Sequence, residues 1–434
     1  MSPSIPSSSA PEPAKSAKAV ASMPTSTAAL LEQYRIPGHD GLYVIGSFDR
    51  KTSLYFQQVR ALNLIWLLSQ SEKLQPGTSV CILGGGIAGV SAAAGLLSRG
   101  QGCVTLLEKG AELLALQRHN HTRRIHPHLY SWPEAGAENP HAGLPLLDWQ
   151  AGISADVAAG WTKEFDELRQ VTGFSCRLQA AVTGLEAAVT AYRVEWEQAG
   201  RLQAERFDLV ILALGVGAER TVVGLPLHSY WEDDALYTGD VLVSGCGEGG
   251  LLEVLRLRLR DFQPEGLAAL ASTADPELRS VLLAWEAAAV DQPDPAAFLT
   301  RQYLALALPG LDRALAEQLR PGLALTLHGP HPNAPLNVQG TILNRLLVAR
   351  LLSIGALDYL GGMQLLEARP VNRQLEACFS DGSRRCFDAV LVRHGASSAL
   401  KKNFAPLWEQ ALAPRTEGTD PTLLLPLWPE GFYS

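Results

Sequence analysis

The chain has 434 residues, of which 47% are hydrophobic and 18% charged, enough for two domains or a large two-lobed fold with a substantial core. Its formal net charge is -8 and its lysines and arginines are scattered. We therefore expect no nucleic-acid partner, because binding to a phosphate backbone needs a concentrated basic surface. No apolar stretch is long enough to span a bilayer, so we expect no membrane partner either.

The N-terminal residues 1–35 are rich in Ser, Pro, Ala and Thr and contain no apolar core long enough for a secretory signal, so we expect a disordered tail. The six cysteines are dispersed and none forms a C-x-x-C pair. Several lie in apolar strand-like runs, where Cys behaves as a small hydrophobe. This usage predicts a reducing compartment and a cytoplasmic protein.

Residues 36–77 are expected to form an N-terminal helical lead-in. A short strand is predicted over 41–47, and Thr52 or Ser53 is a suitable cap for a helix with a broad apolar face. The Pro-Gly pair at 76–77 then marks the turn into the next strand.

The most informative stretch of the chain is a glycine-rich motif. An apolar strand runs into Gly84-x-Gly86-x-x-Gly89, a helix of small residues follows, and a second apolar strand ends on Glu108, about 20 residues beyond the glycines. The first glycine permits a tight turn, the second lets the backbone approach a pyrophosphate, and the third lets the helix lie close on the strand. Glu108 is placed to accept hydrogen bonds from an adenosine ribose. The series predicts a dinucleotide-binding domain over 78–235, with these cofactor-binding residues: Gly84, Gly85, Gly86, Ile87, Ala88, Gly89, Glu108 and Lys109.

A polar segment rich in His and Arg follows over 117–145. In a doubly wound sheet this segment leaves the carboxyl edge of the strands, where ligands bind. Four of its histidines lie within ten residues, but no Cys or carboxylate stands at metal-ligand spacing and the intervening arginines repel a cation, so we expect no metal site. An ordinary polar surface loop is the alternative.

One supersecondary plan occurs twice along the chain. The first copy ends in a strand that begins Phe-Asp and finishes at Gly215. The second copy begins at a turn with Gly245, Gly247 and Gly250 and ends in a Phe-Asp strand that finishes at Gly395. We expect an α/β fold with two Rossmann-like lobes. The first has a mainly parallel sheet, the second spans 236–395 with a helical insertion at about 261–320, and β-meander crossovers join them. A C-terminal extension follows over 396–434.

These features resemble the flavoprotein oxidoreductases that carry two dinucleotide-binding domains and, more loosely, the amine-oxidase-like flavoproteins. The resemblance rests on the first glycine motif with Glu108, on the strand ending Ala-Leu-Gly215, and on the second glycine turn. It implies FAD at the first motif, with Gly215 as a further cofactor-binding residue, and NADH or NADPH at Gly245, Gly247 and Gly250. It covers roughly 78–395, and the first motif is its most specific part.

Three departures from that family stand out. No Gly-Asp pair follows Gly395, although the family usually ends with one that binds the flavin side of the cofactor. A long helix-rich stretch separates the second glycine helix from its next strand, where a nicotinamide site expects that strand about 20 residues on. That strand ends at His328, with no acid and no adjacent Arg. Whether the second turn binds a nucleotide therefore stays open.

The resemblance also implies roles for the polar segment, because in related flavoproteins the chain here runs along the FAD toward the isoalloxazine. Arg124, or its neighbour Arg123, is a candidate to neutralise the pyrophosphate. His126, Tyr130 and Trp132 are the candidate catalytic residues, expected to pack against the flavin ring or to hold the substrate.

The function we expect is FAD-dependent oxidation or reduction of a small organic substrate, with NADH or NADPH as electron donor in a reductase or monooxygenase. One alternative is an FAD-dependent amine or amino-acid oxidase whose second lobe covers the substrate. Another is a non-catalytic FAD-binding protein. The second glycine turn also resembles the first motif of S-adenosylmethionine methyltransferases, although Val243 stands where that family usually carries an acid. A purely structural strand-helix turn is a further alternative for it.

Overall fold

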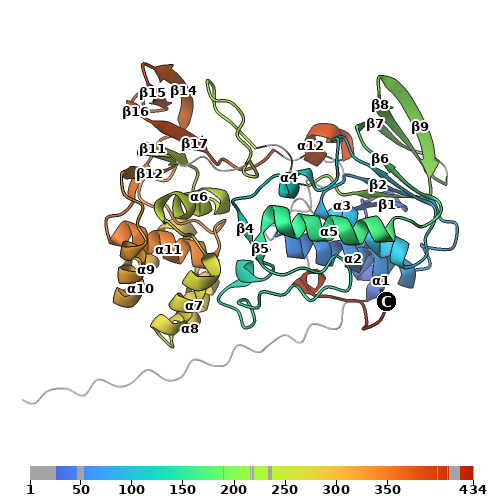
Figure 1. Cartoon of the computed structure of the whole chain (residues 1–434), viewed down its shortest axis with the longest axis horizontal. Coiled ribbons are helices and arrows are strands. Elements are labelled where there is room, and N and C mark those ends of the chain that lie inside the picture. Colours follow the sequence, from blue (N-terminus) through green and yellow to red (C-terminus); the bar gives the residue numbers. More distant parts are fainter. Residues whose placement is uncertain are drawn as a thin grey trace, which may run out of the picture.

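The computed structural model describes residues 26–45, 53–188, 190–215, 217, 219–232, 237–397, 399–407, 409 and 421–433. Most of the expected disordered tail, residues 1–25, lies outside this part of the chain. The expectation of a tail up to residue 35 is too long, because helix α1 (Thr27–Glu32) begins at a Ser26 cap and buries Leu30 and Leu31. The described residues form two lobes (Figure 1).

The first lobe is built on a five-stranded sheet in which every neighbouring pair is parallel, in the order β1-β10-β2-β3-β6. Its strands are β1 (Leu42–Val44), β10 (Leu209–Leu212), β2 (Val80–Leu83), β3 (Val104–Leu107) and β6 (Phe174–Arg177). All but β6 are buried along their length and read as short apolar runs, as strands covered on both faces do.

Alternate residues of these strands point to opposite faces, and each face has its own cover. One face packs against α2 (Leu54–Gln70), α3 (Ile87–Ser98) and α5 (Ser154–Leu168) in a single buried cluster. The other face packs against a three-stranded antiparallel meander, formed by β7 (Ala180–Ala187), β8 (Tyr192–Gln198) and β9 (Arg201–Phe207). The lobe is therefore a three-layer Rossmann-like unit.

The second lobe repeats this layout on a four-stranded parallel sheet in the order β13-β12-β11-β17. The strands are β13 (Asp358–Gly361), β12 (Leu323–Gly329), β11 (Gly239–Ser244) and β17 (Ala389–Val392). Helices α6 (Glu248–Arg258) and α11 (Ile342–Ser353) cover one face. A second meander, β14 (Leu365–Val371), β15 (Gln374–Phe379) and β16 (Arg384–Phe387), covers the other.

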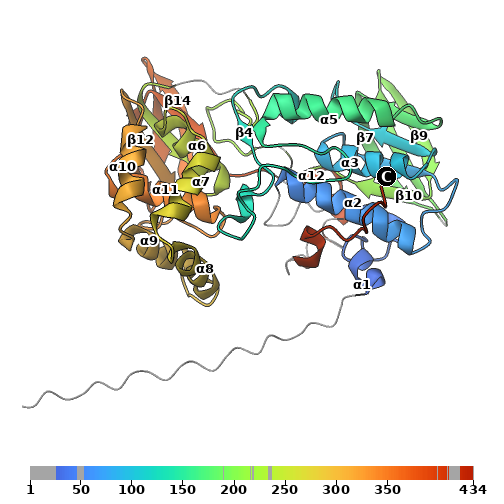
Figure 2. The same cartoon turned by 60° about the horizontal axis from the view of Figure 1, so that its bottom comes forward.

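Four helices between α6 and β12 form the helical insertion expected at about 261–320. They are α7 (Pro264–Ala274), α8 (Leu278–Ala289), α9 (Pro295–Ala305) and α10 (Pro309–Glu317), and they pack onto the same core as α6 and α11. Figure 2 shows α9 and α10 on the outer side of the second lobe, whereas α7 lies on the side that faces the first lobe. The predicted α/β class, with two Rossmann-like lobes, a helical insertion and β-meanders, is confirmed.

The repeated Phe-Asp strands have the same local role in both lobes. Asp208 accepts a hydrogen bond from the backbone N–H of Ser79, just before β2, at 2.8 Å. Asp388 accepts one from the backbone N–H of Asp240, in β11, at 2.7 Å. Each carboxylate fixes the start of the strand that leads into its glycine turn, as expected for residues at strand entries.

The N-terminal segment, expected as a separate helical lead-in, is an integral part of the first lobe. Strand β1 adds to the sheet edge beside β10, and α2 packs along α3. The predicted cap is also present, since the Ser53 hydroxyl accepts a hydrogen bond from the N–H of Phe56. Part of the predicted strand and the other candidate cap, Thr52, lie outside the described residues.

The C-terminal extension returns to the first lobe. Short helices α12 (Ala399–Asn403) and α13 (Ala405–Leu407) follow the second sheet, and a 3-10 turn (Pro421–Leu424) packs on α2. Buried Asn63 of α2 donates to the carbonyls of Leu423 and Leu425 and accepts from the N–H of Leu427. In the part of the chain that the structure describes, no helix combines the length and the apolar character needed to cross a bilayer.

Candidate functional site

The first glycine turn has the geometry that the motif predicts. Gly84 has φ +114°, and a Cβ on it would overlap the carbonyl of Ala213 at the end of β10. A Cβ on Gly89 would overlap the carbonyl oxygen of Gly84 itself. These two positions need glycine for packing, and together they draw the start of α3 against the turn.

Gly86 differs from the other two glycines because it faces open space. It is the N-cap of α3, its backbone is extended, and a Cβ built on it has no heavy atom within 4 Å. Because glycine has no side chain, the region in front of the α3 N-terminus stays open. The first backbone N–H groups of a helix have no partner within the helix, so they can bind an anion there. This is the cradle that a diphosphate requires.

Glu108 stands at the end of β3, beside the turn. Its two carboxylate oxygens accept hydrogen bonds from the N–H groups of Gly85 at 2.7 Å and Gly110 at 2.6 Å. A Cβ on Gly85 would lie 2.9 Å from the Cβ of Glu108 and 2.5 Å from a methyl group of Leu113, so glycine is required there to make room for the acid. The carboxylate is half-buried and fixed in direction, and each oxygen keeps a lone pair for a further donor such as a ribose hydroxyl.

Two other predicted cofactor residues lie near this turn. Lys109 follows Glu108 and is exposed. Gly215, at the end of the Ala-Leu-Gly strand, has φ +67° and is also exposed, two residues beyond the Ala213 carbonyl that Gly84 approaches. The carboxyl ends of β2, β3 and β10 therefore meet at one edge of the first sheet, as the topology predicts.

The polar segment after β3 crosses from the first lobe to the second. Arg123 is buried and pairs at 3.0 Å with Glu253 of α6, which also pairs with Arg393 at the end of β17. Arg124 pairs at 3.0 Å with Glu265 of α7. The two arginines that were candidates for the pyrophosphate are therefore engaged with second-lobe carboxylates, and in this structure they join the lobes.

The pKa of Glu253 reflects this environment. Burial alone would raise it, but Arg256, Arg123 and Arg393 together lower it to about 2. Glu253 is thus ionised at neutral pH, and its charge is balanced by arginines from both lobes. Such a buried, fully paired carboxylate is costly to disrupt, because removing it leaves buried cations without a partner.

The three candidate catalytic residues have different surroundings. Trp132 is 1% exposed in the core of the second lobe, and its indole N–H donates to the hydroxyl of Ser272 at 3.1 Å. These contacts pack Trp132 inside the second lobe, so we no longer consider it a candidate catalytic residue. His126 and Tyr130 are only partly buried.

His126 and Tyr130 are both held in their neutral forms. Burial lowers the pKa of His126 to about 4, and its Nδ1 accepts hydrogen bonds from the N–H groups of His128 and Leu129, each at 3.1 Å. Burial, with the nearby charge of Glu248, raises the pKa of Tyr130 to about 12. Neither residue carries a charge at neutral pH.

Sequence analysis missed two aromatic residues beside this segment. Tyr55 lies edge-on to the His128 ring at 4.5 Å, and Phe56 lies edge-on to Tyr130 at 6.4 Å. Both stand in the first turn of α2, which the sequence placed in the lead-in and not at the lobe junction. The Ser53 cap marked the start of the helix, but nothing local showed that this end would meet the His-rich segment.

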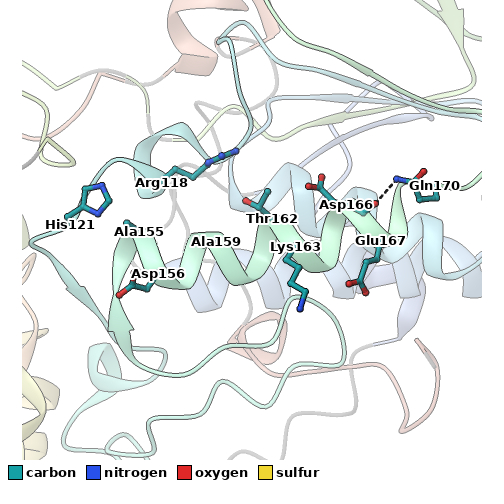
Figure 3. Close-up of a pocket in the computed structure, with 10 residues that line it drawn as sticks. All are labelled: Arg118, His121, Ala155, Asp156, Ala159, Thr162, Lys163, Asp166, Glu167 and Gln170. Carbon is teal, nitrogen blue, oxygen red and sulfur yellow. Dashed lines mark hydrogen bonds between the residues drawn. The ribbon is translucent and has the colours of Figure 1, made fainter.

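Two cavities in the described part of the chain are lined by residues other than the predicted catalytic ones. One of about 760 Å³ runs along α5 and α4 (Ala115–Arg118), and Figure 3 shows most of its lining side chains on α5. Its lining is a mixture of acids, bases and small residues: Arg118, His121, Ala155, Asp156, Ala159, Thr162, Lys163, Asp166, Glu167 and Gln170. A second cavity of about 200 Å³ is lined in part by Leu113, the residue that Gly85 faces, and so lies beside the first turn.

The second glycine turn has nearly the same backbone as the first. Gly247 caps α6 with φ -80° and ψ -177°, and Gly86 caps α3 with φ -75° and ψ -177°. Gly245 has φ +132°, as Gly84 has φ +114°. A Cβ on Gly250 would overlap the Gly245 carbonyl, just as a Cβ on Gly89 would overlap the Gly84 carbonyl. The two turns therefore differ in their surroundings and not in their path.

Comparisons with known proteins find similarity of structure only. No protein-family model matches the chain, and no curated protein is similar to it in sequence. A bacillithiol disulfide reductase from Bacillus cereus is 13% identical with a TM-score of 0.44, and the match covers 76% of this chain and 81% of the reductase chain. LpdA from Mycobacterium tuberculosis is 13% identical with a TM-score of 0.43, covering 76% and 61%. The T. acidophilum thioredoxin reductase is 12% identical with a TM-score of 0.37, covering 73% and 76%. At these values the similarity concerns general layout, and the function of this chain must be argued from its own residues.

Proposed function

We propose that this chain is an FAD-dependent oxidoreductase that acts on a small organic substrate. The observation that carries the proposal is the first glycine turn. Gly84 and Gly89 are packed too closely for any side chain, whereas Gly86 opens the helix N-terminus to a ligand. Glu108 is fixed beside it by two backbone N–H groups. Open amides next to a carboxylate match the diphosphate and the ribose of an adenine dinucleotide.

The first lobe would hold the ADP half of FAD, with backbone amides at Gly86 and the following residues on the diphosphate and Glu108 on the ribose. When bound, FAD supplies a two-electron acceptor that takes or gives a hydride at N5 of the isoalloxazine. The protein then needs no nucleophile of its own. Its tasks are to orient the substrate, exclude water and handle one proton.

The residues that we propose for the substrate side lie where the His-rich segment meets α2. His126 and Tyr130 remain candidates, and Tyr55 joins them through its contact with His128. The rings of His126 and Tyr130 are neutral at physiological pH, and burial also raises the pKa of Tyr55. Such a site favours an uncharged or aromatic group over a strongly charged one.

Two routes of flavin reduction are compatible with this site: by NADH or NADPH, or directly by an oxidisable substrate such as an amine or amino acid. A protein that binds FAD without turnover is the non-enzymatic alternative. Anaerobic mixing separates them, because the flavin loses its yellow colour only when a true electron donor is present. Failure of every biological reductant, with dithionite still effective, would favour the non-catalytic protein.

The proposal is tested by identifying the chromophore released from the purified protein and by comparing variants of the acid. Glu108→Ala removes the ribose acceptor and should weaken FAD retention by roughly 10- to 100-fold, since hydrogen bonds to a charged group are worth about 1.5–3 kcal/mol. Glu112→Ala, four residues along the same loop, is the matched control and should retain the flavin. A colourless protein that refuses added FAD would sink the proposal.

A further inference from the structure

We infer that the second glycine turn, Gly245–Gly250, does not hold a nicotinamide nucleotide, because Cys246 fills the place of the ribose-binding acid and Gln339 lies beside the place of the diphosphate. The inference rests on the proposed function, since it concerns the lobe that would deliver electrons to the flavin. The parallel registers of the two sheets align the two glycine turns residue by residue, so each position of the second turn can be compared with its equivalent in the first.

The ribose end of the second turn has lost its acid. Leu83 pairs with Leu107 in the first sheet, and Ser244 pairs with His328 in the second, so Gly329 stands where Glu108 stands in the first lobe. A glycine provides neither a carboxylate for ribose hydroxyls nor a guanidinium for a 2′-phosphate. The site therefore lacks the group that selects either nicotinamide nucleotide.

The space vacated by the acid is filled from the turn itself. In the first lobe the turn residue is Gly85, whose missing side chain makes room for Glu108. In the second lobe the turn residue is Cys246, and a Cβ on Gly329 would lie 2.5 Å from its Sγ. In the first lobe the turn residue is small and the strand-end residue is large (Gly85 and Glu108). In the second lobe the turn residue is the larger one and the strand-end residue is glycine (Cys246 and Gly329). The thiol is 6% exposed, and burial raises its pKa to about 12, so Cys246 acts as packing and not as a reactive thiolate.

His328 does not replace the missing acid, because its ring is turned into the lobe. Its Nδ1 lies 2.8 Å from the Ser244 hydroxyl, which also contacts His394 Nε2 at 2.7 Å. The ring is 2% exposed and packs against Phe379 at 5.2 Å. It is directed toward the second meander and away from any ligand on the turn.

A side chain also lies beside the diphosphate end of the second turn. A Cβ on Gly247 would lie 3.4 Å from Oε1 of Gln339, whereas the equivalent Gly86 faces nothing within 4 Å. The loop that carries Gln339 is anchored to the turn by Glu248, the first residue of α6. That carboxylate accepts hydrogen bonds from the N–H of Thr341 at 2.6 Å and the amide of Asn344 at 2.8 Å.

The remaining side of the turn faces the lobe junction. A Cβ on Gly249 would lie 3.7 Å from the ring of Tyr230 and 3.9 Å from the side chain of Arg393. The guanidinium of Arg123, from the first lobe, stacks on that Tyr230 ring at 3.9 Å. The second turn is therefore a packed junction that docks the first lobe, and the lobe serves as a cover for the flavin domain.

The experiment uses the yellow holoenzyme and a matched pair of variants. NADH, NADPH and ADP-ribose are titrated by calorimetry up to on the order of 1 mM. Each reduced nucleotide is then mixed anaerobically with the enzyme while the flavin absorbance is followed. We expect no saturable heat, no loss of colour beyond that of a buffer control, and full reduction by dithionite. Gly247→Val, which alters the second turn only, should behave as the parent does.

The inference is overturned if a nicotinamide nucleotide binds saturably or bleaches the flavin and Gly247→Val abolishes this effect while leaving the flavin content unchanged. Bleaching that survives in Gly247→Val instead places the nucleotide away from this turn and supports the inference. A protein that holds no FAD fails at the proposed function, which is a separate result visible before any nucleotide is added.

Discussion

The two glycine turns of this chain follow nearly the same backbone path and have opposite surroundings. In both, the first and third glycines are packed against carbonyl groups so tightly that no side chain fits. At the second glycine, Gly86 faces open space, but Gly247 faces Gln339. At the strand end, Glu108 of the first lobe is replaced by Gly329 of the second. The glycine spacing thus reports how a strand joins a helix, and the residues around it decide whether a nucleotide binds.

The largest expected effect is shared by both turns and separates folding from binding. Gly89→Ala and Gly250→Ala each place a Cβ inside a backbone carbonyl that cannot move without shifting the turn. Each should destabilise the protein by about 3 kcal/mol or more, at the upper end of overpacking costs. Urea unfolding of each lobe, followed by fluorescence, measures this. If Gly250→Ala were as stable as the parent, the claim of equal backbone geometry would be wrong.

The next effect distinguishes the turns. Gly86→Val fills the open space at the α3 N-terminus and should weaken FAD binding by about 100-fold, a loss of about 2.7 kcal/mol. Gly247→Val makes the same change at the same backbone conformation in the second lobe and should leave flavin content at the parent level. The ratio of flavin to protein absorbance measures both variants. A yellow Gly86→Val protein would remove the basis for assigning the first turn to FAD.

A double-mutant cycle tests whether Cys246 occupies the space that a side chain at Gly329 would need. Gly329→Ala drives a methyl group against the Cys246 sulfur and should cost about 2 kcal/mol. In the presence of Cys246→Gly the same change should cost much less, because the blocking atom is gone. The difference is a coupling energy obtained from four unfolding curves. Additive effects would show that the two positions do not compete for one space.

The smallest effect is the pH dependence that Glu248 of the second turn contributes to stability. Burial raises the pKa of Glu248 from 4.5 to about 6, despite its hydrogen bonds to Thr341 and Asn344. Because the folded-state pKa is the higher one, its contribution is fully present below pH 4.5 and is lost as pH rises through 6. The loss amounts to about 1–2 kcal/mol. Between pH 4.5 and 7 the unfolding free energy of the parent relative to Glu248→Gln should fall by this amount, because the buried histidines contribute equally to both proteins. A difference that stays constant with pH would contradict this assignment.

The sequence was sufficient for the features that are local. The strand, glycine turn, helix and acid of the first motif follow one another within about 30 residues, so spacing alone predicted Gly84, Gly86, Gly89 and Glu108. The repeated Phe-Asp strands and the helical insertion were predicted for the same reason. The absence of an acid at the end of β12 was also visible in the sequence, although not what fills its place.

The features that sequence analysis missed depend on long-range contacts. Nothing near β1 indicates that it pairs with β10, more than 160 residues away along the chain. The burial of Trp132 in the second lobe depends on its contact with α7 at Ser272. The reciprocal change at Cys246 and Gly329 appears only when the registers of β11 and β12 are known. In each case the partner is set by tertiary packing and not by neighbouring residues.

One glycine turn of each chain is open to a nucleotide and the other is closed, and counting the adenine nucleotides bound per chain tests this most directly. The holoenzyme is equilibrated with excess NADPH, separated rapidly from free nucleotide, and unfolded to release and quantify everything bound. We predict one adenine nucleotide per chain, all of it FAD. Two per chain, FAD and NADPH together, with the NADPH lost in Gly247→Val, would show that the second turn is open, and none would show that the first is not a cofactor site.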